Sequence, residues 1–93
     1  MRFAQDIEAR LEREFAEPAL STVREALAQI LDMTPRTLRC VLHLGGGRLD
    51  HVLHFAEQAR MDPRDVIYWA EYEEPESPGA SPRRVRDFRS PFE

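Results

Sequence analysis

Four side chains of metal-binding types lie on either side of a run of three glycines. They form the string Cys40-x2-His43-x7-His51-x2-His54, and thiolates and imidazoles are usual ligands of tetrahedral zinc. At about 100° per residue, both pairs lie opposite the apolar side of the helix that carries them. Two helices packed through their apolar sides would point these ligands away from each other. We therefore expect no metal site, and instead a buried thiol with histidines that face solvent or a partner.

The same histidines could take part in acid–base chemistry. Asp50 precedes His54 by four residues and Glu57 follows it by three, and this spacing brings side chains together on a helix. No nucleophile arrangement or cofactor motif accompanies them. The glycines lack the preceding strand and the following lysine of a phosphate-binding loop. We therefore expect no catalytic residue, no cofactor and no enzymatic activity.

The elements that would position these residues are short helices separated by proline and glycine. Apolar residues recur at helical spacing in five stretches, which begin near residues 3, 22, 35, 49 and 63. Pro18 ends the first stretch, in which Asp6 is spaced to pair with Arg10. The pattern predicts an all-α bundle of four to five helices.

Helix boundaries are marked by residues with known capping roles. Ser21 or Thr22 can cap the second helix, Thr34-Pro35 starts the third, and Asp62-Pro63 repeats that signal for the fifth. The run Gly45–Gly47 permits positive φ angles, so it ends the third helix near Leu44 and lets the chain reverse into the fourth, which extends to about residue 60.

The third helix is apolar around most of its circumference. Leu38, Cys40, Val41, Leu42 and Leu44 cover several of its sides, as expected for a helix surrounded by neighbours. We expect it to be the centre of the bundle.

The fifth helix divides its aromatic residues between two sides. Its spacing directs Val66, Trp69 and Ala70 inward, together with Ile67, and leaves Tyr68 and Tyr72 facing outward. Exposed aromatic residues often mark an interface. With the outward histidines of the fourth helix, the candidate interaction surface is Tyr68, Tyr72, His51 and His54.

The composition changes after residue 74, which divides the chain into a helical domain (1–74) and a tail (75–93). The tail holds four of the seven prolines and few apolar residues to offset the entropy of ordering it, so we expect it to be flexible and disordered. Its locally basic second half contains Phe88 and Phe92, which could anchor in a groove of a partner.

Charge and length restrict the classes of partner. The domain carries 14 acidic residues against 9 arginines, a formal charge of −5, which disfavours nucleic acid. A domain this small is marginally stable alone, so we expect a homo-oligomer or a protein partner. The basic residues are all arginine, as is typical of GC-rich bacterial genomes. A single cysteine and the lack of a membrane-spanning or secretory segment predict a cytoplasmic protein without a membrane partner.

The end of the second predicted helix, the turn after it and the third predicted helix contain Leu27, Ala28, Leu31-Asp32-Met33, the run from Thr34 to Leu38, and Val41. These residues resemble the helix-turn-helix of arabinose-regulator-type transcription factors. The resemblance implies a helix that enters the DNA groove, and the residues it would carry into that groove are Arg36, Thr37, Arg39, Cys40 and His43. The sequence departs from the family at Asp32, where the family usually has glycine, and in its acidic charge.

A second resemblance extends over about residues 38–73. The run from Leu38 to Leu44, the glycine turn, Arg48-Leu49 and the run from Arg64 to Tyr72 are similar to short acidic bacterial proteins of uncharacterised function. This resemblance implies a small helical fold and no activity. The function that the sequence favours is a non-enzymatic, self-associating interaction or structural module, and the alternative is a helix-turn-helix DNA-binding regulator.

Overall fold

Five α-helices and a two-stranded sheet make up the computed structural model, which describes residues 3–30, 34–73 and 79–92. The helices are α1 (Gln5–Glu14), α2 (Ala19–Ala28), α3 (Pro35–Gly45), α4 (Leu49–Met61) and α5 (Pro63–Glu71). The strands β1 (Tyr72–Glu73) and β2 (Arg83–Arg84) pair antiparallel, with Tyr72 opposite Arg84. The predicted small all-α fold is confirmed. None of the described helices is long and apolar enough to cross a membrane.

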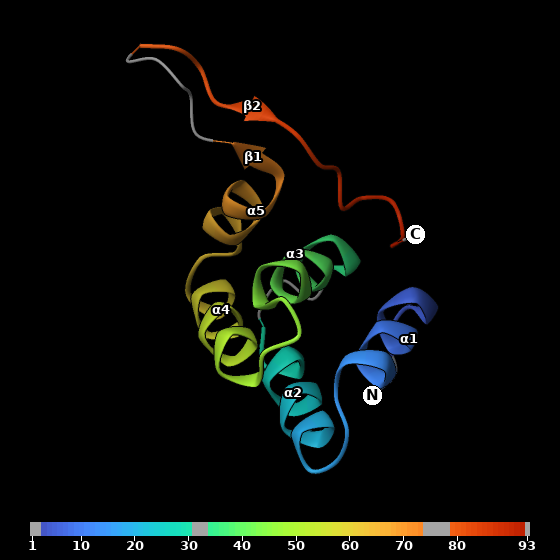
Figure 1. Cartoon of the computed structure of the whole chain (residues 1–93). Coiled ribbons are helices and arrows are strands. Elements are labelled where there is room, and N and C mark those ends of the chain that lie inside the picture. The colour runs from blue at the N-terminus through green and yellow to red at the C-terminus, as the bar shows by residue number, and fades with distance from the viewer. Residues whose placement is uncertain (1–2, 31–33, 74–78, 93) are drawn as a thin grey trace.

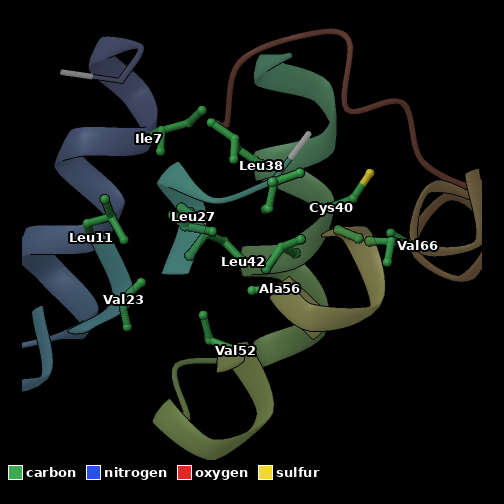
Figure 2. Packing of buried hydrophobic residues seen from close by; sticks show 14 of the residues in the cluster. Ile7, Leu11, Val23, Leu27, Leu38, Cys40, Leu42, Val52, Ala56 and Val66 are labelled. Atoms are coloured by element: carbon green, nitrogen blue, oxygen red, sulfur yellow. The ribbon is translucent and has the colours of Figure 1, made fainter. Parts of the chain in front are cut away.

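Helix α3 lies at the centre of the bundle, as predicted. It packs against α4 and α5 on one side and α1 on the other (Figure 1). Every residue from Thr37 to Leu42 is buried, including the polar Thr37 and Arg39. Figure 2 shows Leu38 and Leu42 of α3 directed toward the side chains of the surrounding helices. Because α3 has neighbours on several sides, it needs apolar side chains around most of its circumference.

The predicted starts of α3 and α5 are confirmed by their caps. The Thr34 hydroxyl accepts a hydrogen bond from the Thr37 backbone N–H at 3.3 Å, and Pro35 occupies the first turn. The Asp62 carboxylate accepts one from the Arg64 N–H at 3.0 Å, and Pro63 follows it. Helix α3 ends at Gly45, one residue later than expected, where Gly46 adopts a left-handed φ of 58°.

The start of α2 differs from the sequence expectation. Neither Ser21 nor Thr22 is its N-cap, because the helix already begins at Ala19, directly after Pro18. Instead the Glu17 carboxylate accepts hydrogen bonds from the Ser21 N–H at 2.9 Å and the Ser21 hydroxyl at 2.7 Å. An acceptor just before the helix thus satisfies a free N–H of its first turn, so a cap at Ser21 or Thr22 is not needed.

The C-terminal segment also differs from expectation in its described part. We expected a tail without structure, but β2 pairs with β1, Phe88 is only 9% exposed, and Phe92 packs against the core. The segment passes from β2 along α3 toward α1 (Figure 1). Its contacts come from ion pairs and two aromatic rings rather than from a periodic apolar pattern, which is why composition did not reveal them. Residues 74–78, where the expected tail begins, lie outside the described residues, as do Leu31, Asp32 and Met33 of the helix-turn-helix match.

The close approach of α3 and α4 gives a stability prediction. A Cβ atom placed on Gly45 would overlap the side chain of Val52, so Gly45→Ala should lower the free energy of unfolding by about 1–3 kcal/mol, the usual cost of overpacking. Urea denaturation would measure this loss. As a control, Val52→Ala should cost less in the Gly45→Ala background than in the wild-type chain. An unchanged denaturation midpoint for Gly45→Ala would contradict the predicted overlap.

Candidate functional site

Five aromatic residues, which we call the aromatic face, form two groups of ring contacts on α4, α5 and β1. The ring centroids of His54 and Phe55 lie 5.0 Å apart, and those of Phe55 and Trp69 lie 6.3 Å apart. Tyr68 and Tyr72 are stacked, with centroids 5.4 Å apart and an interplanar angle of 12°. The expected outward position of Tyr68 agrees with its exposure of 37%.

We expected Trp69 to point into the core, and this prediction is wrong. It is 43% exposed and contacts Phe55 through a ring edge, whereas Val66 and Ala70 are fully buried. At about 100° per residue, Tyr68 lies opposite the buried side of α5, and Trp69 lies on the flank between the two sides. Helix α5 packs against α3 and α4 through the side that carries Val66 and Ala70, so both of its large aromatic residues remain at the surface.

His51 and His54 are both exposed on α4. His51 lies one helical turn before Phe55, and its Nε2 atom is 3.8 Å from the Asp50 carboxylate. Three of the four residues of the expected interaction surface, His54, Tyr68 and Tyr72, thus belong to the aromatic face, and His51 lies at its border.

The four candidate zinc ligands do not come together. Cys40 is fully buried, and its burial, with the nearby charge of Glu71, raises the pKa of the thiol to about 12. His43 lies against Phe88, with ring centroids 5.0 Å apart, while His51 and His54 are on the exposed side of α4. Within the described part of the chain, no three His, Cys, Asp or Glu side chains are grouped so that they could hold a metal ion.

The carboxylates considered for acid–base chemistry are held in exposed ion pairs. Asp50 accepts from Arg48 at 3.4 Å, and Glu57 accepts two hydrogen bonds from Arg60 at 3.0 and 2.6 Å. The nearby arginines hold the pKa of both carboxyls below the ordinary range. These side chains therefore form a solvated charged surface.

The side chains assigned to a DNA groove are engaged inside the molecule. Thr37 is fully buried, Arg39 is 6% exposed, and Arg36 is bound to Glu71. His43 is half-buried under the C-terminal segment. DNA binding stays a prediction of the sequence resemblance, and these contacts do not favour it, because groove recognition needs side chains that reach the base edges.

A buried carboxylate that the sequence did not reveal joins α3, α5 and the C-terminal segment. Glu71 is fully buried, and its oxygens accept hydrogen bonds from Arg36 at 2.9 and 2.7 Å, from Arg84 at 2.8 Å and from the Phe88 N–H at 3.1 Å. Burial alone would raise the pKa of Glu71, but these donors together hold it below its ordinary value of 4.5. No local sequence signal marks Glu71, because its arginine donors lie 35 and 13 residues away along the chain.

A second ion pair, in which Arg39 is buried and Asp6 is half-buried, lies between α1 and α3. The Asp6 carboxylate accepts hydrogen bonds from Arg39 at 2.8 and 3.0 Å and from the Phe92 N–H at 3.1 Å. The expected pairing of Asp6 with Arg10 is therefore wrong. Instead, Arg10 Nε lies 3.2 Å from Glu14 Oε2, and Arg10 Cζ lies 4.3 Å from the ring centroid of Phe92. Asp6 prefers Arg39 because α3 brings a rigid guanidinium to a site that water barely reaches.

We call residues 83–92 the strap, because this segment is held at several points across α5, α3 and α1. Arg39 donates to the backbone carbonyls of Phe88 and Arg89 at 3.1 and 3.4 Å. Two hollows border the Phe92 ring, one of about 330 Å³ beside His43 and one of about 210 Å³ beside Arg10. The strap is therefore fixed mainly by polar contacts and leaves space beside its last aromatic ring.

Comparison of the chain with protein-family models, curated proteins and solved structures gave no match. Functional conclusions therefore depend on the aromatic face and on the strap.

Removing one member of the α1–α3 ion pair should destabilise the fold. Arg39→Met keeps much of the apolar stem but leaves Asp6 without its guanidinium, and breaking a buried pair in this way costs about 3–5 kcal/mol. The matched control is Arg48→Met, whose partner Asp50 is exposed, and we expect a change of less than about 1 kcal/mol there. Urea denaturation of both variants would measure the difference. Equal effects would show that the buried pair contributes no more than the exposed one.

Acidification should destabilise the chain in two stages. Burial, Arg86 and Arg10 hold the pKa of His43 below its ordinary value of 6.5, so the free energy of unfolding should begin to fall as the pH drops below about 6.5. The lowered pKa values of Asp6 and Glu71 give a second loss below about pH 4.5, because the unfolded chain binds protons first.

Urea denaturation at pH 7.5, 5.5 and 3.5 would reveal both stages. His43→Gln should remove the upper stage, whereas the control Glu57→Gln, at an exposed carboxylate, should leave the profile close to that of the wild-type chain. A stability that stays constant from pH 7.5 to 3.5 would contradict the prediction.

Proposed function

We propose that this chain is a non-enzymatic interaction module that self-associates through the aromatic face. The observation that carries the proposal is the exposure of large apolar side chains on neighbouring helices: Trp69 at 43%, Tyr68 at 37% and, at the end of α4, Met61 at 72%. Aromatic residues and methionine are enriched in protein interfaces, where they bury a large area at a small cost in conformational entropy.

A second copy of the chain is a suitable partner because the border of the aromatic face carries both signs of charge. Glu57 and Asp65 are exposed close to Arg60 and Arg64. In a two-fold dimer the same patch meets itself, so an arginine of one copy can approach a carboxylate of the other. Burial of the aromatic face would also compensate for the small core of a domain of this length.

The proposal includes a bacterial, cytoplasmic setting. It is supported by the single, buried cysteine, which suits a reducing compartment, and by the exclusive use of arginine as the basic residue. An interaction role also fits the candidate acid–base residues, whose carboxylates are engaged in ion pairs.

Sedimentation velocity over a range of concentrations would test self-association. The wild-type chain should show a concentration-dependent dimer, and the double variant Tyr68→Ala/Trp69→Ala should weaken its association at least tenfold, because interface aromatics often contribute 2 kcal/mol or more. Val85→Ala is the matched control, since Val85 is a 36% exposed apolar residue outside the aromatic face. A chain that stays monomeric at high concentration, or a dimer that the double variant does not weaken, would refute the proposal.

A further inference from the structure

On the surface that holds the strap, each buried or half-buried carboxylate is paired with an arginine of the helices. We call this surface the strap groove and define it by Asp6, Arg10, Arg36, Arg39 and Glu71, with His43 at its edge. Asp6 is bound to Arg39, and Glu71 is bound to Arg36, through two hydrogen bonds in each case. Departure of the strap would therefore leave each carboxylate with an arginine partner from the helices.

Three of the groups in the groove contact the backbone of the strap. Glu71 accepts from the Phe88 N–H, Arg39 donates to the Phe88 carbonyl, and Asp6 accepts from the Phe92 N–H. Backbone groups are common to every peptide, so these contacts select an extended conformation and a register rather than one sequence.

Three strap side chains at four-residue intervals supply the selectivity. Arg84 donates to Glu71 at 2.8 Å, Phe88 lies against His43, and the Phe92 ring lies under the Arg10 guanidinium at 4.3 Å. Of the four arginines of the strap, Arg84 is the one that donates to a carboxylate of the groove, so the groove selects an arginine at this position.

We propose that the strap groove is a peptide-binding site for extended segments of a partner protein with the pattern Arg-x3-Phe-x3-Phe, and that the strap is its intramolecular occupant. Two features favour release of the strap from the groove. Residues 79–87 are all exposed, and hollows of about 330 and 210 Å³ remain beside Phe92. A tethered segment competes at an effective concentration of about a millimolar, so a free peptide binds weakly until the strap is displaced.

The test uses the full-length variant Phe88→Ala/Phe92→Ala, which weakens the strap and leaves every groove residue in place. The probe is a fluorescently labelled peptide of residues 79–92, followed by anisotropy. The peptide should bind the variant at least tenfold more tightly than it binds the wild-type chain. A peptide that carries Arg84→Glu or Phe88→Ala should lose at least tenfold in affinity.

A groove variant and its control separate specific binding from general attraction to an acidic protein. Adding Glu71→Gln to the double variant should weaken peptide binding severalfold, whereas adding the exposed Glu57→Gln should not change it. Circular dichroism checks that each variant is helical. If the double variant unfolds, the test is repeated with Phe92→Ala alone, because Phe92 is only half-buried. The proposal is overturned if the helical variants do not bind the peptide, if wild-type and variant chains bind it equally, or if Glu57→Gln weakens binding as much as Glu71→Gln.

Discussion

The structure depends on the ionised carboxylate of Glu71, which is fully buried at the end of α5. A buried carboxylate needs enough donors to replace the water it has lost, and Glu71 obtains them from α3, from β2 and from the backbone of the strap. The positions of α5, α3 and the strap are therefore linked through one group. The geometry that satisfies Glu71 also fixes the β1–β2 pairing, because the Glu71 carbonyl accepts the Val85 N–H at 2.7 Å.

Two arginines of α3 each pair with a carboxylate of a neighbouring helix, on opposite sides of the bundle. Arg36 pairs with Glu71 of α5, and Arg39 pairs with Asp6 of α1, so the central helix joins its neighbours by charge as well as by apolar packing. Buried ion pairs add little net stability compared with apolar residues of similar size, but they fix geometry, because a misplaced partner leaves a charge unpaired. This arrangement accounts for the polar residues within a helix that is otherwise apolar.

The two candidate surfaces meet at the end of α5. Tyr72 stacks on Tyr68 in the aromatic face, and it also lies opposite Arg84 in the β1–β2 pair. Arg84 in turn binds Glu71 in the strap groove. Under the two proposals, displacement of the strap would change the surroundings of Tyr72, so an occupant of the groove and an association through the aromatic face would influence each other through this residue.

The sequence by itself determined the order and the boundaries of most helices, because the physical causes are local, and it left the number at four to five. Thr34, Asp62 and Gly45 act within one turn of their own position, and apolar spacing showed that α3 would be central. The outward Tyr68 followed from the same helical geometry. The start of α2 is the exception, since the sequence offered several acceptors and the Glu17 carboxylate took the role expected of Ser21 or Thr22.

Only the tertiary structure decided which charges are buried and where the strap lies. Glu71 and Arg36 are separated by 35 residues, and Asp6 and Phe92 by 86, so no local pattern indicates these pairs. The exposure of Trp69 was decided in the same way, because α5 packs against α3 and α4 through the side that carries Val66 and Ala70. Composition suggested a tail without structure, whereas its contacts arise from donors and acceptors that become neighbours only after the helices have packed.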